Sequence, residues 1–303
     1  MRPLILLTNK ILWYTNIKMN VFKDDLNIIL KTLDIPARQL ASELDFDEPT
    51  ICNWLNGKYE PDVRSKEDIY SYAYENGLRL NLAYEEPLNN LAKKQGFVHL
   101  YHGSKYGIKG EIDINKSSDF NDLGPGFYLG QTLVQSAMFV SDCHRPKVYS
   151  FGLFTKNLKV VELDIGEEWA ICVAYNRNLI DKYSDSKKVK RIIDKTKDAD
   201  VIIAPIADNR MINIIDNFFN GNMSIEACYN SLAVLDLGKQ YVLKTNKAIK
   251  NLGIIKEYYL CKKEIDDYRT QSNKLRQERV ELTKGYISKY KHGKYVDEIL
   301  WEN

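Results

Sequence analysis

The sequence predicts an α+β protein: a small all-α domain, then a domain built on a mixed β-sheet, then a C-terminal helical extension. Apolar residues recur at helical spacing through residues 21–84. From residue 97 to about 255, short runs rich in Val, Ile, Tyr and Phe alternate with helical stretches. Residues 256–303 combine a helical pattern with many basic side chains. A chain of 303 residues is long enough for about two such domains.

The domain boundaries follow these changes of pattern. We expect an extension at residues 1–18, the all-α domain at 19–84, the sheet domain at 97–255 and the basic helical tail at 256–303. A polar link is expected at residues 85–96. Residues 1–18 precede Met19, where the first well-patterned helix begins. A short ordered arm is the alternative interpretation of those residues.

The sheet domain is expected to alternate strands with helices. The expected strands lie at residues 97–102, 147–154, 158–164, 200–206 and 239–244. The expected helices lie near residues 131–141, 167–184, 186–197, 209–220 and 223–233. In the tail, Tyr286, Tyr290 and Tyr295 interleave with basic residues. Such a segment either contacts single-stranded nucleic acid or is a solvated helix face.

Charge and cysteine usage narrow the class of protein. Residues 19–84 hold 7 basic and 12 acidic side chains, a charge of −5, whereas the whole chain carries +2. The five cysteines include no Cys-x-x-Cys pair, which favours reduced thiols in a cytoplasmic protein. Cys143-His144 lacks companion ligands, so we expect no metal site. No apolar stretch is long enough to span a bilayer, and no membrane association is expected.

Two short helices in the all-α domain are predicted to cross. The side chains expected to form their seam are Leu40, Ala41, Leu44, Ile51 and Leu55. Pro49 suits the first turn of the second helix, where its missing N–H is not needed, and Gly57 suits the stop at its end. The pattern Leu-Ala…Ile-x-x-Trp-Leu-x-Gly resembles the helix-turn-helix of phage-repressor-like regulators over roughly residues 22–82.

This resemblance leaves the ligand of the front domain open. Thr50, Asn53 and Asn56 are candidates for reading base edges. However, the second helix has no basic residue before Lys58, and DNA affinity depends on basic contacts to phosphates. The alternatives are therefore DNA binding and docking of a protein partner, such as an antitoxin or a second copy of the chain.

Chemistry is indicated by two motifs, Tyr101-His102-Gly103-Ser104 and Gly124-Pro125-Gly126-Phe127-Tyr128-Leu129. The first ends an apolar strand, on which Val98, Leu100 and His102 share one face while His99 points to the other. Further along the chain come a Gln-Ser-Ala helix at 135–137, Glu168-Trp169 with Asn176-Arg177, Ala207-Asp208-Asn209-Arg210, and Gln240-Tyr241-Val242.

Together, in this order, these motifs resemble a bacterial branch of the ADP-ribosyltransferase superfamily that is catalogued only as a domain of unknown function. The resemblance covers roughly residues 97–255. It implies an enzyme that binds NAD as a substrate and needs no metal. The superfamily's His-Tyr-Glu triad maps onto His102, Tyr128 and Gln240. Gln at the third position is a departure, because an amide accepts a hydrogen bond from a ribose hydroxyl but supplies no negative charge and no general base.

The resemblance implies roles for further residues. Asp208 is the candidate for the missing acid, with an N-cap of the following helix as the alternative. Arg210 is expected to pair with the NAD pyrophosphate or, alternatively, with a neighbouring carboxylate. The remaining candidates for NAD contact are Gly103, Ser104, Asp119 and Phe127, beside His102 and Tyr128.

The sequence therefore predicts a cytoplasmic NAD-dependent ADP-ribosyltransferase. The resemblance implies a toxin of a toxin–antitoxin or phage-defence pair that modifies a protein or a nucleic acid. The alternative is a helix-turn-helix transcriptional regulator with an inactive transferase fold that senses NAD. If the front domain only recruits or autoregulates, removing residues 1–84 is expected to leave transferase activity intact.

Overall fold

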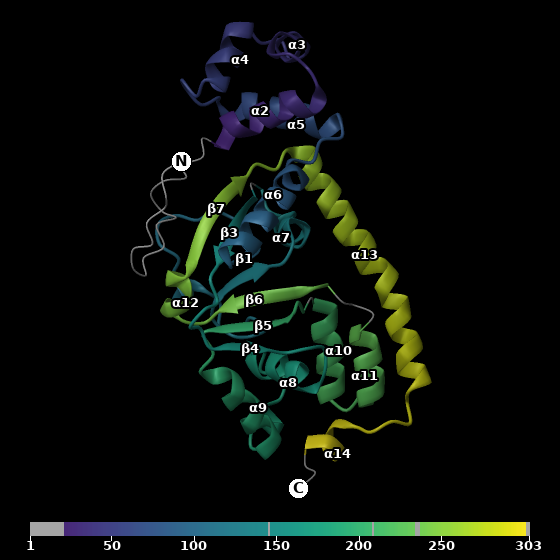
Figure 1. Ribbon diagram of the computed structural model, residues 1–303. Helices are drawn as coiled ribbons and strands as arrows, with labels where there is room; N and C mark the ends of the chain where they lie inside the picture. Colours follow the sequence, from purple (N-terminus) through teal and green to yellow (C-terminus); the bar gives the residue numbers. More distant parts are fainter. Residues whose placement is uncertain (1–20, 145, 208, 234–236, 301–303) are drawn as a thin grey trace.

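A computed structural model of the protein describes residues 21–144, 146–207, 209–233 and 237–300. Four short helices cluster at one end, a seven-stranded sheet with further helices forms the body, and one long helix runs along its side (Figure 1). This arrangement confirms the predicted α+β class. None of the helices in the described ranges has the length and apolar character needed to cross a membrane.

The four front helices enclose a core of their own. They are α2 (Val21–Leu33), α3 (Ala37–Glu43), α4 (Glu48–Leu55) and α5 (Val63–Glu75). Leu26, Ile29, Leu40, Ile51 and Ile69 are fully buried between them. The predicted seam is confirmed, because Leu40, Ala41 and Ile51 are buried and Leu44 and Leu55 pack against the same cluster. Pro49 lies in the first turn of α4, and Gly57 follows its end at φ 68°, as the sequence predicts.

The connection between α5 and the sheet differs from the prediction. The sequence predicts a polar link at residues 85–96, but most of these residues belong to helix α6 (Leu80–Gln95). Pro87 lies inside this helix, where it removes one backbone donor. The helix forms nevertheless because Tyr84 and Ala92 are buried against the body. It ends at Gly96, which adopts φ 76°.

The sheet has the strand order β4-β5-β6-β2-β1-β3-β7. The strands are β1 (Val98–Ser104), β2 (Phe127–Gly130), β3 (Lys147–Leu153), β4 (Val160–Glu162), β5 (Val201–Pro205), β6 (Lys239–Leu243) and β7 (Leu252–Tyr258). Only β4 and β5 run parallel, and the other neighbours are antiparallel. The five expected strands are present. The sequence does not predict β2, which falls on the Gly-Phe-Tyr motif, or β7, which crosses the boundary expected at residue 255.

One face of the sheet carries most of the helices. Over β4, β5, β6 and β2 lie α8 (Glu167–Asn176), α9 (Lys187–Lys197), α10 (Asn209–Phe219) and α11 (Ile225–Ala233), around a core that includes Trp169, Ile202 and Val242. Over β1, β3 and β7 lies α7 (Leu133–Val140). The opposite face holds a third core around Leu100, Phe151 and Leu243, beside α12 (Asn246–Lys250).

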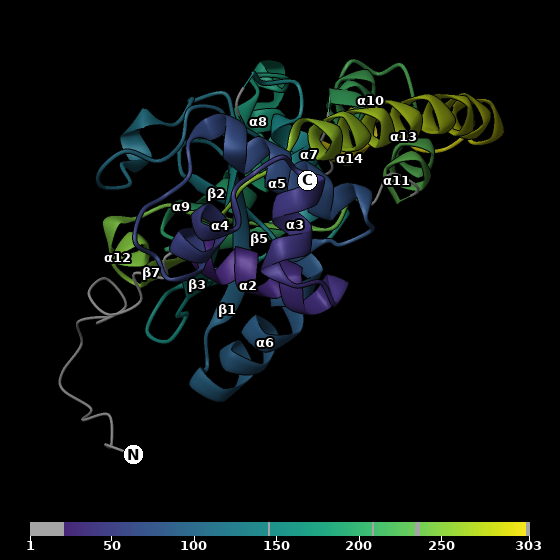
Figure 2. The same ribbon diagram turned by 90° about the horizontal axis from the view of Figure 1, so that it is seen from above.

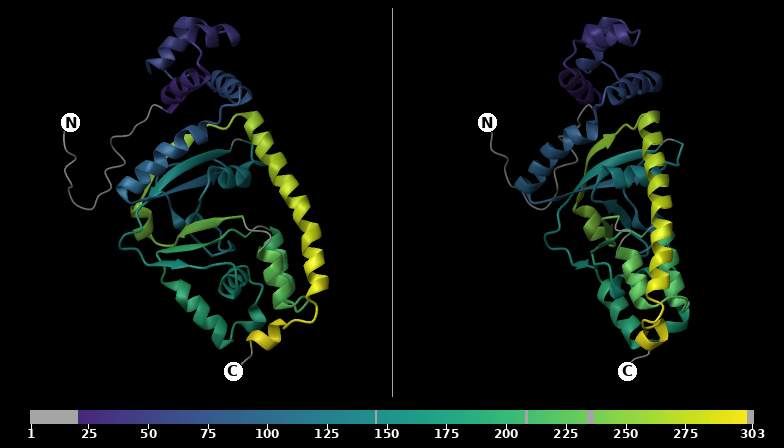
Figure 3. Two further views of the ribbon diagram at one scale, coloured as in Figure 1. Left: turned by 45° about the vertical axis from the view of Figure 1, so that its right-hand side comes forward. Right: turned by 90° about the vertical axis from the view of Figure 1, so that its right-hand side faces the viewer.

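The long helix α13 (Lys262–Lys289) spans the molecule and leads to α14 (Val296–Leu300). It contacts α5 at the front, α7 beside the sheet and α11 at the far end, and the views agree on this course (Figures 2 and 3). The guanidinium of Arg269 donates to the Ser141 carbonyl at 2.7 Å, which fixes the helix to the end of α7. Short 3₁₀ turns lie at Ile114–Lys116 and Asp181–Tyr183.

A buried ion pair joins the front helices to the sheet. The ammonium of Lys256 on β7 lies 2.7 Å from a carboxylate oxygen of Asp25 on α2, and both side chains are at most 2% exposed. The hydroxyls of Tyr70 and Tyr84 donate to the same carboxylate, each at 2.6 Å. The front helices and the sheet therefore share a polar contact that is closed to water.

Candidate functional site

The sheet is weakest between β1 and β2, where the strands pair at a single register position, Tyr101 with Gly130. Immediately beyond that pair, Nδ1 of His102 lies 2.7 Å from the main-chain oxygen of Tyr128. A carbonyl only accepts, so Nδ1 carries the proton and donates. The imidazole thus makes a hydrogen bond from β1 to β2 at the point where main-chain pairing between the two strands ends.

The surroundings of His102 keep its ring neutral. The ring stacks on Phe127 with centroids 4.4 Å apart and lies edge-on to Phe151. Burial lowers the pKa of His102 below its usual value, although the Tyr128 carbonyl acts in the opposite direction. With Nδ1 protonated, Nε2 retains a lone pair. Among the contacts of the described residues, Nε2 has no hydrogen-bond partner.

The other histidine of the strand is directed elsewhere. Nδ1 of His99 contacts the side-chain oxygen of Asn89 on α6 at 3.1 Å, and its ring packs beside Tyr101. Leu100, by contrast, belongs to the core that contains Phe151. Strand alternation therefore separates the two histidines as expected, and His102 is the one at the β1–β2 opening.

Gly103 is constrained by a helix. A Cβ at this position would lie 2.3 Å from the main-chain oxygen of Ser136 and 3.0 Å from a methyl group of Val140, both on α7. Glycine is therefore required for α7 to pack on β1. This packing is an explanation of Gly103 that is independent of any ligand.

Tyr128 has its hydroxyl engaged within the protein. It donates to the Gly124 carbonyl at 2.6 Å and accepts from the Leu123 N–H at 3.2 Å, and burial raises its pKa. Nζ of Lys244 donates to the Leu123 carbonyl at 2.6 Å, and burial lowers the pKa of this lysine to about 8. These hydrogen bonds hold the loop before β2 in place. Because the Tyr128 hydroxyl already donates to Gly124, its ring can contact a ligand but its hydroxyl has no hydrogen to donate to one.

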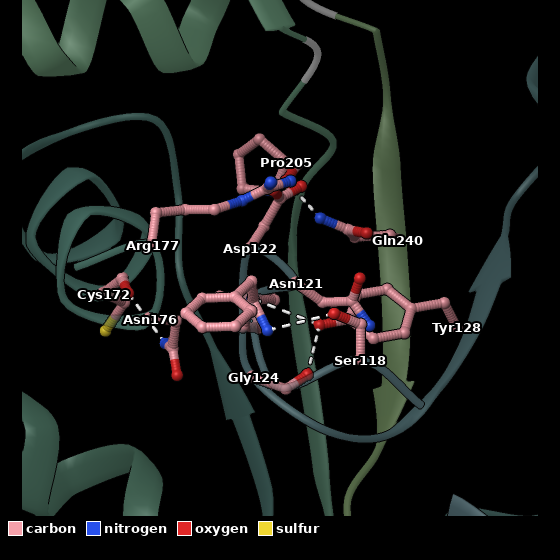
Figure 4. A network of polar contacts seen from close by, with 12 residues as sticks. Ser118, Asn121, Asp122, Gly124, Tyr128, Cys172, Asn176, Arg177, Pro205 and Gln240 are labelled. Atoms are coloured by element: carbon pink, nitrogen blue, oxygen red, sulfur yellow. Dashed lines mark hydrogen bonds and ion pairs between the residues drawn. The ribbon is translucent and has the colours of Figure 1, made fainter. Parts of the chain in front are cut away.

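Gln240 lies in a buried polar network (Figure 4). Its Nε2 donates to the Pro205 carbonyl at 3.0 Å, and the buried Asp122 carboxylate lies nearby (Figure 4). Arg177 donates to the same carboxylate through Nε at 3.1 Å and Nη2 at 2.6 Å. Register pairing places Gln240 opposite Gly130 and Tyr128 opposite Val242, so Gln240 and Tyr128 share the helix-covered face.

The candidates do not all lie on one face of the sheet, because His102 points with Phe127 and Phe151 to the face opposite Tyr128 and Gln240. Phe127 stacks on His102, and Ser104 is half-buried at the end of β1. Arg210 lies in the first turn of α10. Asp208, the candidate acid, lies outside the described residues. Asp119 is exposed on the loop before β2.

An open pocket adjoins that loop. It has a volume of about 330 Å³ and is lined by Asp119, Tyr175, Asn176, Asn178, Ile180, Asp181 and Ser184. A Cβ at Gly124 would meet the side-chain oxygen of Asn176 at 2.6 Å, so the pocket wall and the Tyr128 loop are in contact. Two exposed aromatic rings, Phe120 on the loop and Phe139 on α7, also lie on segments that flank the site.

Sequence reasoning missed Asp122 and gave Arg177 no role. The pattern Asp-Leu-Gly before a strand is common in loops, so nothing local marks the carboxylate as a partner of Arg177. An Asn-Arg pair at the end of a helix is equally uninformative. The network is visible only once β5, β6 and α8 are assembled.

Comparison with known proteins gives one match. Residues 98–254, just over half of the chain, match the family described as protein of unknown function (DUF3990). No curated protein matches the chain, and no solved structure does. The matched range begins with β1 and ends within β7, so it takes in His102, Asp122, Tyr128 and Gln240 together. The chain therefore belongs to the DUF3990 family.

Proposed function

We propose that the protein is an NAD-dependent ADP-ribosyltransferase that modifies a protein or a nucleic acid. The observation that supports this best is the state of His102, whose Nδ1–H is fixed on the Tyr128 carbonyl while Nε2 keeps its lone pair. A ribose hydroxyl donates to such a nitrogen. Tyr128 and Gln240 lie on β2 and β6, which pair with each other next to β1.

The reaction assigns a part to each residue. The bond between the nicotinamide nitrogen and C1 of its ribose breaks, the electron pair leaves with nicotinamide, and a nucleophile of the acceptor bonds to C1 and gives its proton to solvent. His102, which lies at the β1–β2 opening but points to the opposite face from Tyr128 and Gln240, orients a ribose through Nε2. The Tyr128 ring lines the nicotinamide subsite, and Oε1 of Gln240 accepts from the nicotinamide-ribose hydroxyl.

Gln240 limits the rate of this chemistry. C1 becomes positively charged as the bond breaks, and a nearby carboxylate stabilises that charge better than a neutral amide does. We therefore expect NAD binding to be strong relative to turnover. The same departure favours the second candidate, a regulator in which an inactive transferase fold senses NAD.

The first test measures transfer of labelled ADP-ribose from NAD to macromolecules in a cell lysate. We expect His102→Ala and Gln240→Ala to reduce the labelling at least about 100-fold and 10-fold respectively, since each removes a contact to the reacting nucleotide. His99→Ala and Gln271→Ala are the matched controls, because His99 faces α6 and Gln271 is exposed on α13. Equal labelling by all four variants would exclude the proposed site.

For the front helices we propose a helix-turn-helix that docks a protein. Asn53, a candidate for reading bases, donates instead to the Tyr59 hydroxyl at 3.2 Å. Asp45, Asp47 and Glu48 are exposed where α4 begins. This charge repels phosphates and suits a basic partner, such as an antitoxin in a toxin–antitoxin or phage-defence pair.

A pulldown of genomic DNA fragments at moderate salt separates the two roles of the front helices. Enrichment of a preferred sequence would favour the regulator over the docking module. For the enzyme, mass spectrometry after brief expression in cells identifies which molecules carry ADP-ribose. Modified DNA, RNA or protein would then define the acceptor.

A further inference from the structure

Lys244 reaches from the end of β6 onto the loop at residues 122–126, which precedes β2 and is called the Gly-Pro-Gly loop below. The main-chain N–H of Lys244 donates to the Asp200 carbonyl at 2.9 Å, so the root of the side chain is fixed beside the start of β5. The side chain itself is half-buried, and its Nζ donates to the main-chain oxygen of Leu123 at 2.6 Å. Lys244 therefore ties the loop to the sheet.

The two glycines of the Gly-Pro-Gly loop leave room for this lysine. A Cβ on Gly126 would lie 3.4 Å from Cδ of Lys244 and 2.9 Å from the main-chain oxygen of Leu243. A Cβ on Gly124, whose φ of 74° already favours glycine, would lie 3.2 Å from Nζ of Lys244. The aliphatic part of the side chain thus runs along the loop, and the amine ends beside Gly124.

The Tyr128 hydroxyl holds neighbouring groups of the same loop. It accepts from the Leu123 N–H at 3.2 Å and donates to the Gly124 carbonyl at 2.6 Å (Figure 4). The Leu123 carbonyl, which lies between these two groups in the chain, is the one that Lys244 binds. Two side chains therefore hold three successive peptide units, and a shift of the loop would move the groups that fix the Tyr128 ring.

The contact with the Leu123 carbonyl compensates for the partial removal of the Lys244 amine from water. Burial lowers the pKa of Lys244 to about 8, and no carboxylate of the described residues forms an ion pair with it. A lysine usually keeps its ammonium in water, and moving the charge away from water costs free energy. A charged donor also makes a stronger hydrogen bond to a carbonyl than a neutral donor does. The arrangement is thus one in which the lysine serves the loop.

We propose that Lys244 is a positioning residue that holds the Gly-Pro-Gly loop, so that the Tyr128 ring keeps the orientation in which it contacts nicotinamide. This inference rests on the proposed function for the identity of the ligand. Lys244 itself is assigned no contact with NAD, because it acts only through the loop and Tyr128. NAD binding must therefore depend on Lys244 only while the Tyr128 ring is present, whereas a merely structural role would have the same effect with or without that ring.

The experiment is a double-mutant cycle of Lys244→Met and Tyr128→Ala in the full chain, with Kd for NAD and with KM and kcat for NAD cleavage as readouts. Methionine keeps most of the aliphatic chain and removes the donor. We expect Lys244→Met alone to raise Kd and KM about tenfold and to change kcat less than about threefold, because the ring contributes to binding rather than to bond breaking. In the Tyr128→Ala background it should change Kd less than about twofold.

The matched control of this cycle is Lys250→Met, which removes an exposed lysine at the end of α12. We expect its Kd, KM and kcat to equal those of the wild type. An equal rise of Kd on replacing Lys244 in both backgrounds would overturn the proposal, because Lys244 would then act without Tyr128.

Hydrogen exchange tests the hold on the loop without NAD. The Leu123 N–H donates to the Tyr128 hydroxyl, so its exchange rate reports whether the loop stays in place. We expect a peptide that contains residues 122–126 to exchange at least about tenfold faster in Lys244→Met than in the wild type or in Lys250→Met. Unchanged exchange would contradict the positioning role even if NAD binding is weaker. If the wild type neither binds nor cleaves NAD while exchange still depends on Lys244, the proposed function fails and the hold on the loop stands.

Discussion

Glu264, in the first turn of α13, is a half-buried carboxyl group that folding partly removes from water. Burial raises the pKa of Glu264 to about 7, although the Tyr268 hydroxyl donates to it at 3.2 Å and the charge of Arg79 lowers it. The folded protein therefore binds this proton more tightly than the unfolded chain does. Stability falls as pH rises from the unfolded pKa near 4.5 to about 7, and then stays lower.

Replacing Glu264 by Gln should remove this pH dependence. We expect Glu264→Gln to be more stable than the wild type by at most about 3 kcal/mol at pH 8, because the cost of ionising the buried group disappears. At pH 4.5 the two proteins should differ little. Urea unfolding at the two pH values measures the difference. A gain of equal size at both would show that ionisation is not its cause.

Residues of the site were predictable only where a local sequence pattern, such as an apolar strand followed by glycine, marks their position. His102 follows an apolar strand and precedes glycine, and strand alternation distinguishes it from His99. Asp122 gives no such sign, because its partner Arg177 is 55 positions away in the sequence. Burial and pairing of a carboxylate depend on assembled elements, and no local pattern encodes them.

Among the elements, the contact of β1 with α7 makes a sharp prediction. Gly103→Ala would place a methyl group 2.3 Å from the Ser136 carbonyl, so α7 must move away from the sheet. We expect a loss of stability of about 2–4 kcal/mol in urea unfolding. Gly166→Ala is the control, since a Cβ there meets nothing closer than 3.9 Å. Equal stability of the two variants would mean that α7 repacks freely.

The elements that escaped prediction share a cause. β2 is four residues long and is held by its neighbours β6 and β1, so its own sequence is indistinguishable from a turn. α6 contains Pro87 and a polar surface, and its helix is stabilised by the few side chains that pack on the body. Tertiary contacts decide both cases. The strands that are long and apolar, such as β3 and β5, were predictable because burial alone accounts for their sequence.

For the whole molecule, the pair Asp25–Lys256 predicts strong coupling between the front helices and the sheet. Removing one partner leaves the other charge buried, which costs about 3–5 kcal/mol, whereas removing both costs much less. We therefore expect Asp25→Asn and Lys256→Met each to destabilise the protein, and the double variant to be more stable than the sum of the two predicts. Additive losses would indicate that water reaches the pair.

The sequence suggests that residues 1–84 are dispensable for transferase activity, and the structure gives reason to expect otherwise. A cut after residue 84 divides α6 and removes Asp25 from beside Lys256. Asp25 and Lys256 are 231 positions apart, and no local sequence pattern predicts their contact. The composition of the front helices and of the sheet domain therefore does not reveal that the two pack together through a buried ion pair. A truncated chain carrying Lys256→Met is the fairer test of an independent transferase domain.

The course of α13 has a thermodynamic consequence. The two halves of the sheet meet at the single β1–β2 rung, and α13 bridges them while its first turns contact α5. Under the proposed function, a ligand that alters the spacing at that rung acts on a helix that also contacts the front helices, where the proposed protein partner would dock. If NAD changes the affinity for that partner by some factor, the partner must change the affinity for NAD by the same factor, and the balance of the two concentrations sets occupancy of both.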